Sequence, residues 1–136
     1  MGFQPRRAGA LNWLRKRRTE IWDQAIEAPT GDIEAAKRIR EICRSAADSA
    51  AKVGAAADRT HRKIKPDVER FERAARAAME AAMQVCDELL RDAAVRQIVE
   101  LCLKAGNLTT AQTLFRAIQT KSIRDELVRE FPQLQP

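Results

Sequence analysis

Tyrosine is missing from this 136-residue chain, and aromatic residues make up only 4% of it. Glycine and proline are scarce as well, with five of each. No stretch shows the alternation of apolar and polar residues that is typical of a β-strand. These absences predict an all-α protein of five or six helices. Because alanine dominates the apolar residues, we expect a core of small side chains that pack closely.

Long apolar runs are also absent. No stretch approaches the roughly 18 apolar residues of a transmembrane helix, and four consecutive cations interrupt the first apolar stretch. We therefore expect neither a membrane span nor a secretory signal.

Glycine-rich phosphate loops and the Glu-x-x-His motif of di-iron bundles are missing. The single histidine, His61, lies among four cations that disfavour its protonation, and we interpret it as an exposed residue near a helix end. We predict no catalytic residue and no cofactor.

The chain has three cysteines, Cys43, Cys86 and Cys102, and no pair of them has C-x-x-C spacing. An odd number without such a pair argues against a disulfide framework and indicates a reducing compartment, so we expect a cytoplasmic protein. Cys43 and Cys86 lie on the apolar stripes of the helices expected there, where cysteine acts as a small hydrophobic residue. A metal site is therefore not expected.

Acidic residues are absent before Glu20, and this absence carries the main functional signal. Residues 1–18 hold six Lys/Arg, while the remainder holds 19 Lys/Arg and 19 Asp/Glu. The whole net charge of +6 therefore belongs to these 18 residues, which we call the basic segment. Such an arm is typical of proteins that bind polyanions. The residues that we predict to contact nucleic acid are Arg6, Arg7, Trp13, Arg15, Lys16, Arg17 and Arg18.

Nucleic acid, either DNA or RNA, is the partner that this composition favours. Arginine binds phosphate oxygens in a bidentate manner, and each neutralised phosphate releases counterions. Trp13 could stack on an unpaired base. The four cations of residues 15–18 span a full helical turn, so no face of that turn is apolar. A helix surrounded by charge suits a groove or a phosphate channel better than a bilayer.

Three alternatives for the basic segment stay open. Phe3, Leu11, Trp13 and Leu14 could insert into an anionic membrane surface while the cations meet the head groups. The segment could also be an organellar import sequence, although its lack of serine counts against this. It could finally be a solvated terminus without a function.

The first half of the chain predicts a long helical hairpin. A first helix over residues 8–28 completes a basic N-terminal arm, residues 1–28. A helical domain, residues 29–131, begins with a helix over 32–64 that Asp32 caps and Pro66 follows. Gly54 marks a bend or a close crossing within it, and its continuity there is left open. Two heptad series describe its apolar stripe: Ala36, Cys43, Ala50, Ala57 and Ile64, and Ile39, Ala46, Val53 and Thr60.

A third helix begins with Asp67 as its cap and continues the heptad spacing. Its stripe is Val68, Phe71, Ala75, Ala78, Ala82, Val85 and Leu89. Residues 32–91 therefore predict an antiparallel, Ala-rich hairpin whose seam allows a close approach of the backbones. The same seam could also support a homodimer.

The C-terminal residues 93–131 predict three shorter helices. Gly106 ends the helix over 93–105 in a left-handed conformation, and Asn107 caps the next one. The apolar face of that helix is Leu108, Ala111, Leu114, Phe115 and Ile118. Ser122 and Asp125 predict a capping box for a last helix that ends at Phe131. We expect residues 132–136 to be a frayed tail.

The stretch KAGNLTTAQTLFRAI, residues 104–118, resembles the centre of a tetratricopeptide-type helical repeat. Gly106 and Asn107 occupy the stop and cap positions of that pattern, followed in register by Leu108, Ala111, Phe115 and Ala117. The resemblance covers about one repeat within residues 95–119, with a weaker echo at 30–42, and the usual Trp-Leu-Gly opening is missing from both. It implies peptide or protein binding, with Leu108, Ala111 and Phe115 as interaction residues.

Together these observations predict a non-catalytic binding protein. In this hypothesis the basic segment contacts a polyanion, most simply nucleic acid, and the helical body self-associates or docks a protein partner. The opposing hypothesis is a helical-repeat adaptor for protein–protein interaction, in which the basic segment is incidental.

Overall fold

The computed structural model describes residues 20–23, 31–58 and 60–135 of the chain. These residues form five α-helices, two 3-10 turns and no strand, which confirms the expected all-α fold. The elements are η1 (Ile21–Asp23), α2 (Asp32–Ala55), α3 (Lys65–Ala82), α4 (Glu88–Lys104), α5 (Leu108–Ala117), α6 (Lys121–Glu130) and η2 (Pro132–Leu134). The first helix predicted for residues 8–28 lies outside the described residues, except for the turn η1.

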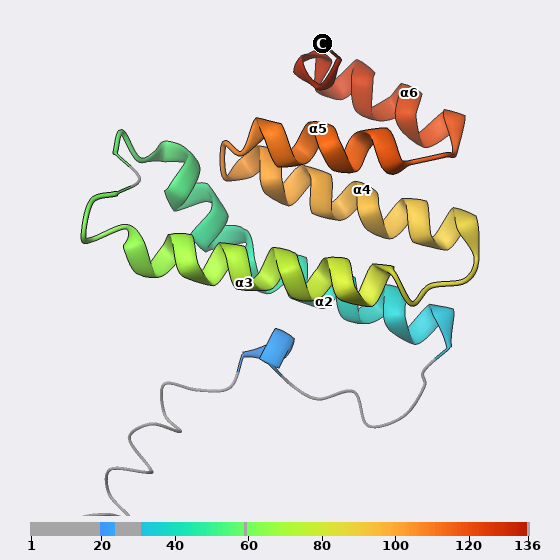
Figure 1. The fold of residues 1–136 in the computed structure, drawn as a ribbon, viewed down its shortest axis with the longest axis horizontal. Coiled ribbons are helices and arrows are strands. Elements are labelled where there is room, and N and C mark those ends of the chain that lie inside the picture. Colours follow the sequence, from blue (N-terminus) through green and yellow to red (C-terminus); the bar gives the residue numbers. More distant parts are fainter. Residues whose placement is uncertain (1–19, 24–30, 59, 136) are drawn as a thin grey trace, which may run out of the picture.

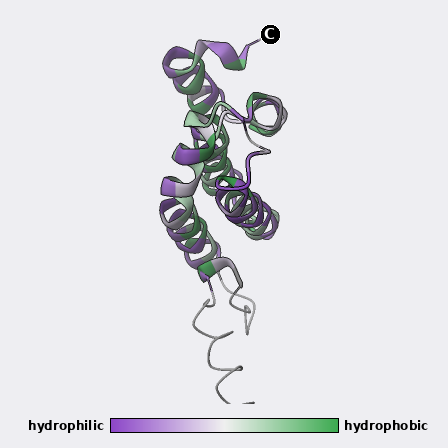
Figure 2. Cartoon of the chain, turned by 90° about the vertical axis from the view of Figure 1, so that its left-hand side faces the viewer, coloured by the Kyte–Doolittle hydropathy of each residue, from purple (hydrophilic) through white to green (hydrophobic). Residues whose placement is uncertain are grey.

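The helices form successive layers, and the chain reverses direction between them (Figure 1). α2 and α3 make an antiparallel hairpin, and α4 packs against both of them and also against α5 and α6. η1 contacts α2 and α3, on the side of the hairpin away from the C-terminus. Each helix carries both hydrophilic and hydrophobic residues, as expected for amphipathic helices around one core (Figure 2).

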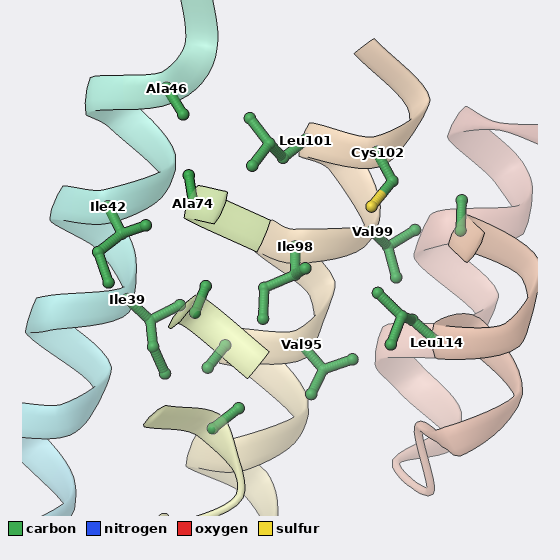
Figure 3. Packing of buried hydrophobic residues seen from close by; sticks show 14 of the residues in the cluster. Ile39, Ile42, Ala46, Ala74, Val95, Ile98, Val99, Leu101, Cys102 and Leu114 are labelled. Atoms are coloured by element: carbon green, nitrogen blue, oxygen red, sulfur yellow. The ribbon is translucent and has the colours of Figure 1, made fainter. Parts of the chain in front are cut away.

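The buried face of α2 follows a heptad spacing, as predicted, but the first two positions of one series are displaced by a residue. Ile39, Ala46 and Val53 are buried as expected, and so is Ala50 of the other series. Ala36 and Cys43 are only partly buried, and Ala35 and Ile42 take their place in the core. The reason is that α2 packs against α4 as well as α3. Figure 3 shows side chains of α2 opposite the branched residues of α4.

The helix predicted to reach residue 64 ends at Ala55, so the longer expectation was wrong. The carboxylate of Asp58 accepts hydrogen bonds from the backbone N–H and the hydroxyl of Thr60, at 2.9 and 2.6 Å. A short polar side chain that binds the backbone locally competes with helix formation. Gly54 marks a close crossing, as one of the two alternatives predicted, because it lies against the end of α4.

The hairpin is also shorter at its other end. α3 begins at Lys65 with Ile64 as its N-cap, so Asp67 lies inside the first turn and does not cap it. α3 ends at Ala82, and Leu89 belongs to the first turn of α4, where it is exposed. The carboxylate of Asp32 accepts from the N–H groups of Cys86 and Asp87, at 3.0 and 2.7 Å. Asp32, which was expected to cap its own helix, thus holds the α3–α4 connection instead.

The predicted stop and start between α4 and α5 are confirmed. Gly106 has a φ of 75°, and the side chain of Asn107 accepts from the N–H of Thr110 at 3.1 Å. The predicted capping box at Ser122 and Asp125 is wrong, because Thr120 is the N-cap of α6. Buried Asp92 of α4 accepts from the N–H groups of Gln119 and Thr120 and from the Thr120 hydroxyl.

The end of the chain is packed against the body, which corrects the expectation of a frayed tail for its described part. Pro132–Leu134 forms the 3-10 turn η2 beside α5 and α6. Leu134 is 1% exposed, and the carbonyl of Gln133 accepts from the amide of Gln112 in α5. A buried leucine contributes about 1.5–3 kcal/mol to stability, and the hydrogen bond from Gln112 adds to what holds this segment.

Candidate functional site

The residues predicted to bind nucleic acid lie outside the described residues. They are Arg6, Arg7, Trp13, Arg15, Lys16, Arg17 and Arg18. The described chain begins two positions after the last of them, at Glu20. The attachment of the basic segment to the body is therefore defined by residues 20–23, which we call the root of the segment.

An arginine from the hairpin holds this root. Nε of Arg70 in α3 donates to Oε1 of Glu20 at 3.0 Å, and Nη2 donates to Oε2 at 3.4 Å. Both side chains are largely shielded, with 30% and 20% exposure. Paired donors on a planar guanidinium fix the direction of a carboxylate as well as its distance. The root therefore meets α3 in a defined orientation.

Trp22 gives the root its apolar contact. Its side chain is 7% exposed and belongs to the core cluster of the hairpin. The guanidinium carbon of Arg70 lies 4.9 Å from the centre of the Trp22 ring, which is a cation–π distance. Among the residues that the structure describes, the indole N–H finds no hydrogen-bond partner. Burial of the ring, rather than a bond from its N–H, thus anchors Trp22.

The same arginine connects the root to the interior of the hairpin. Nη1 of Arg70 donates to the hydroxyl of Ser49 at 3.1 Å, and this hydroxyl donates to Oδ1 of Asp67 at 3.0 Å. Ser49 is 4% exposed, so its hydroxyl needs these partners. A continuous chain of hydrogen bonds therefore runs from Glu20 to the first turn of α3. Sequence analysis missed it because its members are up to 50 residues apart.

The three residues predicted to bind a protein partner are placed differently from one another. Leu108 is 38% exposed at the start of α5, whereas Ala111 is fully buried and Phe115 is 7% exposed. Phe115 also has the guanidinium of Arg124 in α6 above its ring, at 5.9 Å. The side chains of Ala111 and Phe115 thus pack within the protein itself. Of the three residues, Leu108 has the most exposed surface for a partner.

The cysteines differ in accessibility. Burial raises the pKa of Cys43 to about 12 and that of Cys102 to about 11. For Cys43, nearby Cys102 and Glu100 add to this effect. Cys86 is exposed in the α3–α4 connection, which corrects its expected place on the apolar stripe of a helix. Within the described residues no disulfide is formed, and no group of three His, Cys, Asp or Glu side chains could hold a metal ion.

His61 lies between α2 and α3 rather than in the last turns of a helix as expected, and it is exposed. Its Nδ1 accepts from the N–H of Lys63 at 3.1 Å.

Among the described helices, none is both long and apolar enough to cross a bilayer. No protein-family model matches the chain, and no curated protein or solved structure is similar to it at a significant level.

Proposed function

We propose that this protein is a non-catalytic binding protein whose basic segment holds a polyanion, most simply a nucleic acid. The helical body serves as a rigid base for that segment. The observation that carries the proposal is the charge distribution, since residues 1–18 contain six Lys/Arg and no Asp/Glu. Attraction between such a segment and a phosphate backbone requires no shaped active site.

The anchored root supports this proposal. Glu20 and Trp22 are fixed to the hairpin by Arg70 and by burial, so the basic segment starts from a defined point on the body. A polyanion held by the segment would therefore be kept close to the hairpin. The acidic residue nearest to the segment, Glu20, is already paired with Arg70 and competes less for the cations.

Fluorescence anisotropy with a labelled 20-nucleotide single strand tests the proposal. The full chain carrying Arg15→Gln, Lys16→Gln, Arg17→Gln and Arg18→Gln should bind at least tenfold more weakly at 100 mM salt. The slope of log affinity against log salt should become shallower by up to about 2.8, or roughly 0.7 for each lost contact with a single strand. Replacing Arg116, Lys121, Arg124 and Arg129 by Gln removes the same charge elsewhere and serves as the matched control.

Equal weakening by the two sets of substitutions would mean that only net charge matters, and would overturn the role of the basic segment. Binding that is strong for anionic vesicles and absent for oligonucleotides would favour the membrane alternative. The adaptor alternative rests on the repeat-like residues 95–119 and on the exposed side chain of Leu108. In that case Leu108→Ser should weaken capture of a protein partner and leave oligonucleotide binding unchanged.

A further inference from the structure

A second basic region lies at the α2–α3 connection, where the sequence suggested only a helix end. Residues 51–67 hold five Lys/Arg and two Asp, so the rest of the body after residue 18 is acidic on balance. The body therefore has a net charge of zero only as a whole, because a basic region and an acidic remainder cancel. One of the five cations, Arg59, lies outside the described residues, and no contact is assigned to it.

The cations of this connection are available to a ligand. In the described part of the chain, Lys52, Arg62, Lys63 and Lys65 make no ion pair. The two local carboxylates are already engaged, since Asp58 accepts from Thr60 and Asp67 accepts from Ser49. Hydrogen bonding keeps the pKa of Asp58 below its ordinary value, so its acceptor role in the turn is stable. An approaching anion would thus meet cations that have no partner to give up.

An open cavity of about 610 Å³ lies between the end of α2 and the start of α3. Its apolar surface comes from small or aliphatic side chains, among them Ala56, Ala57 and Ile64. Its polar edge includes Lys52, His61 and Lys63. Because Nδ1 of His61 accepts from the backbone, the neutral ring carries its proton on Nε2, which is a donor. An apolar floor with cations and one donor at its edge suits a nucleobase flanked by phosphates.

A chain of hydrogen bonds links the cavity to the root of the basic segment. Asp67 lines the cavity and also ends the hydrogen-bond chain that starts at Glu20 and passes through Arg70 and Ser49. Asp67 and Arg70 are three residues apart on α3, or about one helical turn of 5 Å. Two basic stretches that are separated by about 35 residues in sequence are therefore attached to the same turn-and-a-half of α3, one through Arg70 and the other through Asp67.

We propose that this cavity accepts one unpaired base of a single-stranded nucleic acid, while Lys52 and Lys63 contact the phosphates on either side of it. This inference rests on the proposed function, because the basic segment would hold the same strand. Two adjacent contacts on one strand act as linked sites, so their joint affinity exceeds that of either alone. The apolar floor favours a single strand over a duplex, whose bases are stacked and paired.

The test uses the full chain and a labelled 12-nucleotide single strand at 50 mM salt. Lys52→Gln with Lys63→Gln should weaken binding about tenfold and make the salt slope shallower by about 1.4, for two lost phosphate contacts. Arg116→Gln with Lys121→Gln is the matched control and should change the affinity less than twofold. Equal binding by the wild-type and loop variants would overturn the proposal.

A second variant separates base insertion from simple charge attraction. Ala57→Leu fills the cavity without changing the charge, so it should weaken single-strand binding about threefold or more and leave heparin binding unchanged. Loss of affinity for both ligands, or for neither, would overturn the base site. Circular dichroism melting of each variant checks that the fold is retained.

The loop variants are also placed in the full chain that carries the four Gln substitutions at residues 15–18. If the loop still contributes in that chain while the four substitutions have no effect alone, the cavity is supported and the role of the basic segment fails. If the four substitutions weaken binding and the loop variants do not, the proposed function stands and this inference fails.

Discussion

The α-carbon of Gly54 in α2 lies directly against the carbonyl of Lys104 at the end of α4. A β-carbon at position 54 would be 2.1 Å from that oxygen and 3.2 Å from its carbon. Both atoms belong to the backbone, so neither can move as the tip of a flexible side chain would. Glycine therefore allows the two helix ends to touch, and α2 stops one residue later.

We expect Gly54→Ala to destabilise the protein by about 2–4 kcal/mol, despite the roughly 1 kcal/mol that alanine gains over glycine in a helix. Thermal and urea unfolding measure this change. Gly31→Ala is the matched control, because a β-carbon at Gly31 would meet nothing within 4 Å. Its effect should stay within about 1 kcal/mol. A neutral Gly54→Ala would contradict the close crossing.

Asp92 fixes the start of α6 through three hydrogen bonds and is 1% exposed. Asp92→Ala leaves the N–H groups of Gln119 and Thr120 without this acceptor, and should cost about 2–4 kcal/mol. Hydrogen exchange should show the largest loss of protection in α6 and η2. Asp125→Asn, in an exposed pair with Lys121, should leave the melting temperature nearly unchanged, because solvent screens such pairs. Equal effects of the two substitutions would contradict this assignment.

Arg70 should control the environment of Trp22. In a Trp13→Phe background, Arg70→Gln removes the Glu20 pair and the guanidinium over the ring, so the Trp22 emission should shift to longer wavelength. Arg76→Gln changes an exposed position six residues further along the same helix and should leave the spectrum unchanged. An unshifted spectrum for Arg70→Gln would mean that burial alone holds the root.

Asp32 should contribute to the pH dependence of stability. Hydrogen bonds from the N–H groups of Cys86 and Asp87 lower the pKa of Asp32 in the folded state. A lowered folded pKa stabilises the protein above the unfolded pKa of about 3.9, and this contribution is lost as pH falls through the folded pKa. Asp32→Asn should therefore flatten the fall in stability below about pH 4. A wild-type slope in the variant would disprove this role.

The three cysteine thiols should react at different rates with a thiol reagent. Cys86 is exposed, whereas burial raises the pKa of Cys43 to about 12 and of Cys102 to about 11. At pH 8 the two raised thiols are almost entirely protonated, and the thiolate is the reactive form. Ellman's reagent should therefore titrate one thiol quickly and all three only after denaturation. Cys86→Ser should remove the fast phase.

Some of the fold could be predicted because its signals are local. The stop at Gly106 and the cap at Asn107 depend on a few neighbouring residues, and both are confirmed. The heptad spacing of Ile39, Ala46 and Val53 correctly identified one buried series, since any helix that packs on a neighbour buries residues at that spacing. Ala35 and Ile42 replace Ala36 and Cys43 in the core because α2 also packs against α4. The sequence of α2 does not reveal that neighbour.

The candidate site was predictable only in part. Charge is additive along a sequence, so the basic segment is visible from composition alone. The root and the loop cavity are not, because Glu20, Ser49 and Arg70 meet through folding and have no common spacing. The helix caps predicted at Asp32, Asp67 and Ser122 were wrong for the same reason.

The sequence by itself determined an all-α chain with small core residues and a charge excess confined to its first 18 positions, because propensity, spacing and charge act over a few residues. Only the tertiary structure decided where α2 ends, which carboxylate holds which helix, and that hydrogen bonds link a cationic loop to the root of the basic segment. A carboxylate binds whichever free N–H groups the fold brings to it, and this choice is made between residues that are far apart along the chain.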